Sequence, residues 1–257
     1  MFFLFKAAGN LYTPDTVSRV PKKRNLPAPA PWKEPMNVSV FTALKPLVLA
    51  SGSPRRQEFL RGLGLAFTVA APTAPEPLPT PRETPQAFAL RAARAKAAEV
   101  APLYPAAAVI AADTVVALED EIMGKPASED EAVAMLRRLA GRGHVVCTGC
   151  CLRLPEGREE AFCATSEVIM RAWPDAALRA YAAGGEPADK AGAYAIQGQG
   201  AFLVEQISGS WTNIVGLPLA ELLDVLLVHG VIAPAIDGLG SGGTACDGRC
   251  ESVELKT

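Results

Sequence analysis

Hydrophobic residues occur in short runs separated by polar turns along residues 46–230, and the period of each run predicts its structure. Continuous or alternating apolar runs predict strands over 47–50, 66–70, 108–118, 145–154, 160–172 and 201–207. Apolar residues at helical spacing predict helices over 54–63, 84–100 and 128–139, and after Pro174 and Pro218. The turn at 155–157 makes a hairpin of the two longest late strands. This mixture of elements predicts an α/β fold with a mixed sheet.

The two ends of the chain lack such periodicity. Residues 1–45 are rich in proline and contain a Lys-Lys-Arg cluster, so we predict a flexible N-terminal arm. As an alternative, Met36 is the true start, because it stands just ahead of the first convincing strand. Residues 231–257 become rich in glycine and serine and are predicted to form a loose tail. Residues 46–230 are then a single folded domain.

Composition and charge exclude several classes of protein. Hydrophobic residues make up 49% and charged residues 20% of the 257 residues, which indicates a globular protein with a sizeable core. Lys and Arg number 25 against 27 Asp and Glu, so the basic excess of a general nucleic-acid binder is missing. No apolar run reaches the length of a membrane helix. Six cysteines are too few for a disulfide scaffold, and we predict a reduced, cytoplasmic protein.

The first chemical signal is Ser-Gly-Ser-Pro-Arg-Arg at 51–56, between a predicted strand and a predicted helix. Ser53 suits the N-cap and Pro54 the first helical position, which places Arg55 and Arg56 in the first turn. Two cations are unfavourable at the positive end of a helix dipole unless an anion lies there too. The segment therefore favours a phosphate site, against the alternative of two exposed arginines.

The second signal is a lone carboxylate, Asp113, inside the apolar strand 108–118. A buried aspartate needs a partner or a metal. Glu76, Lys96 and Lys125 lie nearby in the predicted order of elements. Carboxylates and cations together suit a site where a divalent metal handles a polyphosphate, although ordinary salt bridges would explain each residue taken alone.

The third signal is a glycine-rich segment, Asp-Lys-Ala-Gly-Ala-Tyr-Ala-Ile-Gln-Gly, at 189–198. Glycines let the backbone approach a ligand closely, and the amide of Gln197 could donate to and accept from a nucleobase edge. The alternative is a plain connecting loop.

Together the three segments resemble the Maf family of nucleoside triphosphate pyrophosphatases, in the family's order and over about residues 46–229. The resemblance implies a Maf/ITPase-like α/β fold with an elongated mixed sheet, two lobes and a central cleft. It implies hydrolysis between the α and β phosphates with a divalent cation, Mg²⁺ or Mn²⁺, and a homodimer. Asp113 matches the catalytic carboxylate, and Glu76 would complete the metal site. Residues matched to substrate binding are Ser51, Arg55, Arg56, Lys96, Thr114, Lys125 and Gln197.

The segment at 189–194 is similar to the branch that acts on dTTP and UTP, and modified pyrimidine nucleotides are further candidate substrates. The alternatives are a 7-methyl-GTP-type pyrophosphatase and a non-catalytic, nucleotide-binding regulator of cell division. Ala195 stands where the family usually has glycine, and a positive φ there would strain an alanine.

A competing interpretation is a metal-binding module that uses the cysteines at 147, 150 and 151 with Cys246 and Cys250. A C-x-x-C inside a strand is a weak signal, because its two side chains point to opposite faces. His144 and His229 are expected at the surface or at a cap.

Overall fold

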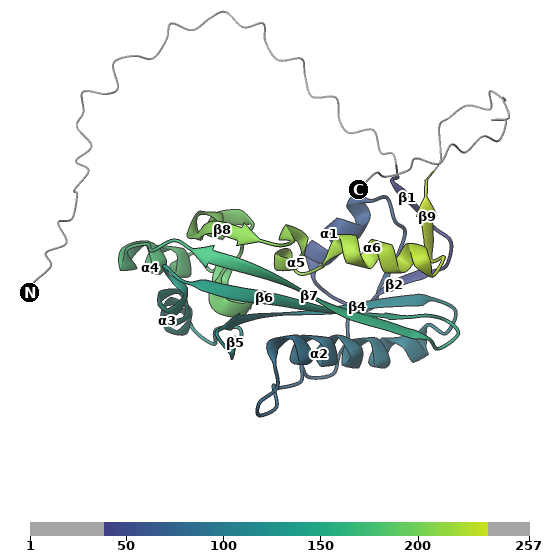
Figure 1. The fold of residues 1–257 in the computed structure, drawn as a ribbon, viewed down its shortest axis with the longest axis horizontal. Coiled ribbons are helices and arrows are strands. Elements are labelled where there is room, and N and C mark those ends of the chain that lie inside the picture. The colour runs from purple at the N-terminus through teal and green to yellow at the C-terminus, as the bar shows by residue number, and fades with distance from the viewer. Residues whose placement is uncertain (1–38, 236–257) are drawn as a thin grey trace, which may run out of the picture. The chain divides into compact units, whose positions relative to one another are not determined.

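The computed structural model describes residues 39–235, so Met36, Cys246, Cys250 and most of the predicted arm and tail lie outside the described residues. The seven strands of the main sheet are β2 (Leu47–Leu49), β3 (Thr68–Val69), β4 (Ala108–Leu118), β5 (Glu121–Met123), β6 (Gly143–Arg153), β7 (Glu159–Met170) and β8 (Val204–Ser208) (Figure 1). The α-helices are α1 (Pro54–Gly62), α2 (Pro85–Val100), α3 (Glu129–Leu139), α4 (Asp175–Ala183), α5 (Trp211–Val215) and α6 (Leu219–Val228).

The main sheet has the order β3-β2-β4-β6-β7-β8, and β2 runs parallel to both β3 and β4. The remaining pairs are antiparallel, so the sheet is mixed as predicted. The strands β4, β6 and β7 each span 11 or 12 residues and make the sheet long in the strand direction. The hairpin of β6 and β7 pairs Gly143 with Ile169 at one end and Arg153 with Glu159 at the other, which confirms the predicted hairpin.

The strand β4 has one continuous edge and one interrupted edge. Along one edge, residues 109–117 pair with β6. Along the other edge, β2 pairs with residues 108–110 and β5 with residues 116–118. Residues 111–115 of this second edge therefore face no strand. Side chains from both faces of β4 can reach the gap, because a strand places successive side chains on opposite faces.

The helix α2 packs against one face of the sheet with a surface of small residues. Ala89, Ala92, Ala93 and Ala97 are all buried against β4 and β6. A side chain at Gly149 of β6 would collide with the main chain of Ala89, so the helix lies on the strand without an intervening side chain. Thr84 begins the helix by accepting a hydrogen bond from the Ala87 N–H, as its N-cap position predicts.

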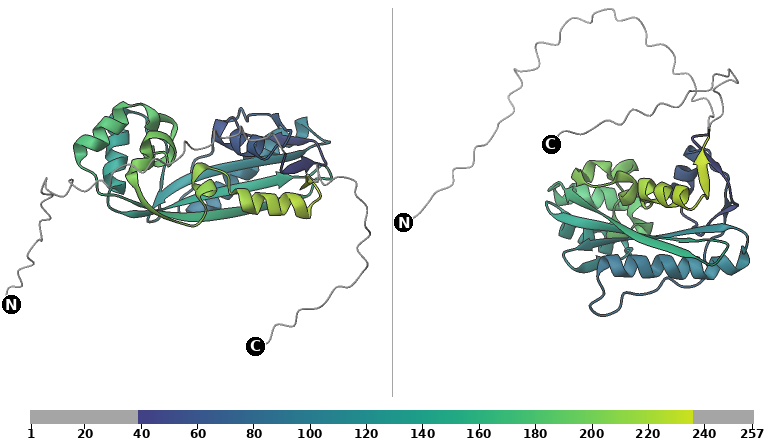
Figure 2. Two further views of the ribbon diagram at one scale, coloured as in Figure 1. Left: turned by 90° about the horizontal axis from the view of Figure 1, so that it is seen from above. Right: turned by 45° about the vertical axis from the view of Figure 1, so that its right-hand side comes forward.

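Two hydrophobic cores lie on the other face, and they define the two lobes that the family resemblance implied. One packs α3 and α4 against β4, β6 and β7, around Leu136, Met170 and Tyr181. The other packs α1 and α6 against β2 and the start of β4, around Leu60 and Leu226. Figures 1 and 2 show α3 and α4 toward one end of the long sheet and α1 and α6 toward the other.

A small second sheet pairs β1 (Phe41–Ala43) with β9 (Ile232–Pro234). These residues were predicted to belong to the arm and the tail, but in the structure they are part of the folded body. The reason is burial: Ile232 joins the core of α1 and α6, where Phe41 packs beside it. Two three-residue strands separated by almost the whole domain carry no recognisable period.

Candidate active site

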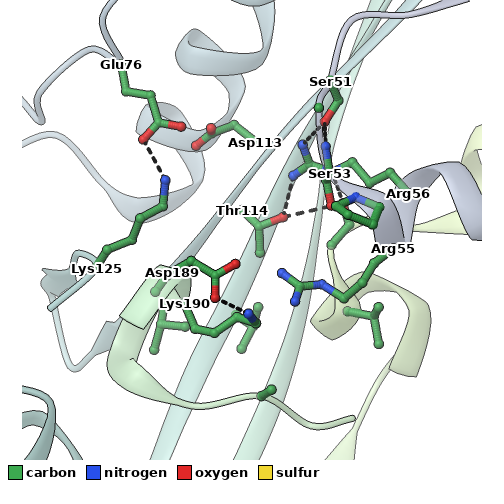
Figure 3. Close-up of a pocket in the computed structure, with 18 of the residues that line it drawn as sticks. Ser51, Ser53, Arg55, Arg56, Glu76, Asp113, Thr114, Lys125, Asp189 and Lys190 are labelled. Carbon is green, nitrogen blue, oxygen red and sulfur yellow. Dashed lines mark hydrogen bonds and ion pairs between the residues drawn. The ribbon is translucent and has the colours of Figure 1, made fainter. Parts of the chain in front are cut away.

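A cavity of about 690 Å³ opens at the gap in β4, between the two lobes. All nine residues that the sequence singled out line it, and Figure 3 labels seven of them, all but Lys96 and Gln197. They are Ser51, Arg55, Arg56, Glu76, Lys96, Asp113, Thr114, Lys125 and Gln197. The segments that carry them come from across the domain, so the structure brings together residues that the sequence separates by up to 146 positions.

The first turn of α1 forms one wall of the cavity. Ser53 is the N-cap residue and Pro54 follows it, as predicted, but the Ser53 side chain makes no capping hydrogen bond. The first turn contains no acidic residue. Ser51 Oγ instead accepts a hydrogen bond from the Ser53 N–H at 3.3 Å. The positive end of this helix therefore has no compensating negative charge of its own, which suits an anionic ligand.

Arg56 is buried, and it donates a hydrogen bond to a main-chain oxygen on the edge of β4 that faces no strand. Its guanidinium donates to the carbonyl oxygen of Ala112 at 2.8 Å and to that of Gly216 at 2.7 Å. It also donates to Ser51 Oγ at 3.0 Å and Thr114 Oγ1 at 3.1 Å. Burial lowers its pKa below the usual arginine value, although Asp113 opposes the shift. Four of five N–H groups are thus committed, so Arg56 positions the site more than it clamps a ligand.

Arg55 behaves differently from its neighbour. Its guanidinium points into the cavity toward Asp189 and Lys190, which are paired with each other (Figure 3). The positive charges of Lys190 and then Arg55 hold the pKa of Asp189 below its usual value. Asp189 and Lys190 belong to the predicted glycine-rich segment, but they were not predicted as residues of the site. Their adjacent opposite charges in a glycine-rich segment were the available signal.

Asp113 and Lys96 form a largely buried ion pair on the α2 side of the gap. Lys96 Nζ lies 2.5 Å from Asp113 Oδ1, and the two side chains are only 15% and 14% exposed. Lys96 also reaches Glu76 Oε1 at 3.3 Å, and Lys125 Nζ reaches Glu76 Oε2 at 3.2 Å. Partial burial alone would raise the pKa of Glu76, but Lys96 and Lys125 together lower it below the usual value. Both carboxyl groups thus lie beside lysine ammonium groups, which can also bind the oxygens of a phosphate.

The residues present fit a divalent cation. Glu76 and Asp113 lie close together, because both lie within hydrogen-bond distance of the same ammonium group of Lys96. Hard oxygen ligands and few protein carboxylates are typical of Mg²⁺ sites that share the ion with substrate phosphates.

The far end of the cavity is mainly apolar. It is lined by Val116, Val146, Tyr194, Ile196 and Ile214, all of which pack in the core of α3 and α4.

The glycine-rich segment closes this end against β4. Gly192 has φ +68°, and a Cβ there would lie 2.9 Å from Val116 Cγ1. Ala195 is absent from the residues with positive φ, so the strain expected there does not arise.

His144 lies behind this apolar end. His144 was expected at the surface or at a cap, and this was wrong: it is 4% exposed, because it lies near the start of β6 on the face that packs in the core of α3 and α4. Its Nε2 lies 2.7 Å from the hydroxyl of Tyr194, and the two rings meet edge to face. Burial lowers the pKa of His144 to about 4 and raises that of Tyr194, so both are neutral near pH 7. His229 ends α6 as its C-cap residue.

A chain of buried hydroxyl groups supports the middle of the cavity, and sequence reasoning missed it. Thr114 Oγ1 lies 2.9 Å from Thr148 Oγ1 on the paired strand. Thr148 Oγ1 donates to the Asn213 carbonyl at 3.0 Å, and the Asn213 side chain donates to Ser166 Oγ at 2.9 Å. A threonine or serine inside a strand is ordinary in composition, so only the register of β4, β6 and β7 reveals the chain.

The cysteines do not form the alternative metal site within residues 39–235. Cys150 lies in the core of α1 and α6, whereas Cys147 and Cys151 lie on the opposite face in two separate clusters against α2. No group of three His, Cys, Asp or Glu side chains in this part of the chain could share an ion. A helix long and apolar enough to cross a membrane is likewise not found among these residues.

Curated relatives cover most of the domain. A dTTP/UTP pyrophosphatase of Nitratidesulfovibrio vulgaris is 57% identical over 192 residues, which is 75% of this chain and 91% of that protein. One of Oleidesulfovibrio alaskensis is also 57% identical, over 78% of this chain and 93% of that protein. One of Myxococcus xanthus is 49% identical over 73% of this chain and 94% of that protein.

Among solved structures, a nucleoside-triphosphatase / dITP/XTP pyrophosphatase from Mycobacterium abscessus is 17% identical, with a TM-score of 0.37 over 72% of this chain and 93% of that one. The fold assignment therefore rests on the strands and helices described above. The family described as Maf-like protein matches residues 46–228, more than two thirds of the chain. With the relatives above, this match shows that the chain belongs to the Maf family.

Proposed function

We propose that this protein hydrolyses dTTP and UTP to the nucleoside monophosphate and pyrophosphate. The observation that carries the proposal is the division of one cavity into a charged end and an apolar end. Its volume suits a nucleotide, since small-molecule sites commonly enclose about 300–1,000 Å³. Relatives at up to 57% identity bear the name dTTP/UTP pyrophosphatase, which supports the same substrates here.

The charged end would hold the triphosphate. Arg55 extends into the cavity, and Lys125 lies opposite it, beside Glu76 (Figure 3). Lys96 also contacts Glu76. The first-turn N–H groups of α1 add a positive dipole end without a carboxylate to neutralise it. In this arrangement each lysine exchanges part of its contact with a carboxylate for contact with phosphate oxygens.

Asp113 would act as the general base. Its carboxylate takes a proton from a water molecule as the water oxygen bonds to the α-phosphorus. The bond from that phosphorus to the bridging oxygen of the β-phosphate breaks, and pyrophosphate leaves with its negative charge matched by Lys96, Lys125 and Arg55. Lys96 fixes the orientation of the carboxylate through the 2.5 Å contact with Oδ1. The second carboxylate oxygen remains for the water.

Glu76 and Asp113 would hold a divalent cation, Mg²⁺ or Mn²⁺. Such an ion supplies charge neutralisation of the phosphate oxygens when bound. Its requirement is tested by activity after chelation and by addition of each ion separately.

The apolar end would hold the base, with Gln197 at its rim for hydrogen bonding to the base edge. We also propose, from the family resemblance, a homodimer in the cytoplasm. Measurement of the molecular mass in solution tests the homodimer. The cytoplasmic location is supported by the free thiols at Cys147, Cys150, Cys151 and Cys163, since thiols stay reduced in that compartment.

The decisive experiment is a panel of nucleotides with pyrophosphate release as the readout, including dTTP, UTP, CTP, 7-methyl-GTP and 5-methyl-UTP. We expect dTTP and UTP to give the highest kcat/KM. Preference for 7-methyl-GTP would instead assign the chain to the other branch of the family. Tight nucleotide binding without pyrophosphate release would indicate the non-catalytic regulator.

A further inference from the structure

The hydroxyl chain behind the cavity fixes which way the Thr114 hydroxyl points. Thr148 Oγ1 lies 3.0 Å from the carbonyl oxygen of Asn213, which can only accept a hydrogen bond. A threonine hydroxyl has one proton to give, so Thr148 uses it there. The 2.9 Å contact between Thr114 Oγ1 and Thr148 Oγ1 then requires Thr114 to be the donor.

The reverse arrangement is worse. If Thr148 donated its proton to Thr114, Thr148 Oγ1 and the Asn213 carbonyl oxygen would lie 3.0 Å apart with no proton between them. Thr114 would then depend on the Gly216 carbonyl at 3.5 Å, the outer limit of a hydrogen bond. In either arrangement Thr114 donates its proton to another group of the protein and not to a ligand. The favoured arrangement also leaves one lone pair of Thr114 Oγ1 free, since Arg56 donates to the other at 3.1 Å.

The position of Thr114 selects the part of the nucleotide that meets this lone pair. Thr114 lies in β4 between Asp113, at the charged end of the cavity, and Val116, at the apolar end. The sugar of a nucleotide lies between its phosphates and its base. The group opposite Thr114 must be a hydrogen-bond donor, and a sugar hydroxyl is the donor available there. The 3′-hydroxyl is present in both dTTP and UTP, whereas the 2′-hydroxyl is present only in UTP.

We propose that Thr114 accepts a hydrogen bond from the sugar 3′-hydroxyl, and that Thr148 is the positioning residue that keeps Thr114 an acceptor. The proposal rests on the proposed function for the identity of the ligand. It predicts discrimination against nucleotides without a 3′-hydroxyl, because the Thr114 lone pair would then be left unpaired in a mostly buried site.

The test compares dTTP with 2′,3′-dideoxy-TTP, which differs by that one hydroxyl. We expect wild-type kcat/KM to favour dTTP by about tenfold, the effect of one hydrogen bond. Thr114→Val should bring the ratio close to one. Thr148→Val should lower the ratio as well, whereas Thr148→Ser, which keeps the hydroxyl, should restore it.

Thr165→Val is the matched control, because Thr165 lies on the neighbouring strand but contacts Cys147 on the α2 side. Its ratio should equal that of the wild type. A tenfold preference that survives Thr114→Val, or equal ratios in Thr148→Val and Thr148→Ser, would overturn the proposal. Thermal unfolding of each variant verifies that it folds.

Binding of the two nucleotides to the Asp113→Asn variant, measured by calorimetry, gives the same comparison without turnover. If the wild type hydrolyses neither nucleotide but binding still favours dTTP over 2′,3′-dideoxy-TTP, the proposed function is refuted and the role of Thr114 is not. Hydrolysis of both nucleotides at equal kcat/KM in the wild type would refute only the role of Thr114.

Discussion

The two ends of the cavity are built in different ways. At the charged end, side chains are held by ion pairs and by hydrogen bonds to main-chain oxygens, as for Lys96 with Asp113 and Arg56 with Ala112. At the apolar end, Val116, Val146 and Tyr194 are held by packing in the core of α3 and α4. The charged end can recognise only what all nucleotides share, so changes there should affect every substrate alike. Changes at the apolar end should alter the ratios between substrates.

The largest effect should come from Asp113→Asn. Loss of the general base should lower kcat by about 10³-fold for dTTP and UTP alike, because the base acts on the phosphate and not on the nucleobase. Asp120→Asn, in the exposed turn after β4, is the matched control and should keep wild-type activity. Rapid hydrolysis by Asp113→Asn, or a loss confined to one nucleotide, would break the distinction between the two ends.

Arg56→Met tests whether a residue of the charged end also stabilises the fold. The change leaves the carbonyl oxygens of Ala112 and Gly216 without the guanidinium, and we expect a loss of about 3 kcal/mol in the free energy of unfolding. Arg55→Met should raise KM and leave stability nearly unchanged, because Arg55 extends into the cavity. Urea unfolding of both variants measures the difference, and equal stabilities would contradict the assigned roles.

His144 should make the apolar end sensitive to acid. Its folded-state pKa of about 4 lies below the unfolded value near 6.5, so unfolding takes up a proton between these values. Stability should therefore be full above pH 6.5 and fall as the pH drops toward 4, by on the order of 3 kcal/mol.

A His144→Gln variant should lose this part of the pH dependence, as measured by unfolding at pH 7, 5.5 and 4.5. An unchanged pH profile would show that the acid sensitivity arises elsewhere.

Gln197→Ala should have the smallest effect, confined to substrate choice. We expect the kcat/KM ratios among dTTP, UTP and CTP to change by about tenfold, the equivalent of one or two hydrogen bonds. Gln199→Ala, two residues along but outside the cavity, is the control. Equal losses for all bases would place Gln197 with the charged end and not with the base.

Much of the fold follows from local pattern. The strand 108–118, the hairpin of β6 and β7 and the helix α2 were predicted nearly to their ends, because each is long and strongly periodic. The nine residues around the cavity were predicted from three motifs and the family resemblance. Their assignment to catalysis, metal binding and specificity stays a prediction until the variants are measured.

The missed features depend on pairing between distant segments. The gap in β4 exists only because β2 stops after residue 49 and β5 begins at residue 121, and no local pattern states which strand each will join. The burial of Arg56 follows from that gap. His144 and Thr148 were missed for the same reason, since the register of β6 decides what each side chain meets.

Gly149 has a consequence for the chemistry on the other side of the sheet. A helix that rests on side chains can slide as their rotamers change, but α2 touches β6 backbone to backbone at this glycine. Lys96 is carried by that helix, and Asp113 is the residue that pairs with Gly149 in the sheet. The ammonium and the carboxylate therefore lie on a helix and a sheet that touch at one point, and a methyl group added at Gly149 would force the helix and the sheet to shift relative to each other.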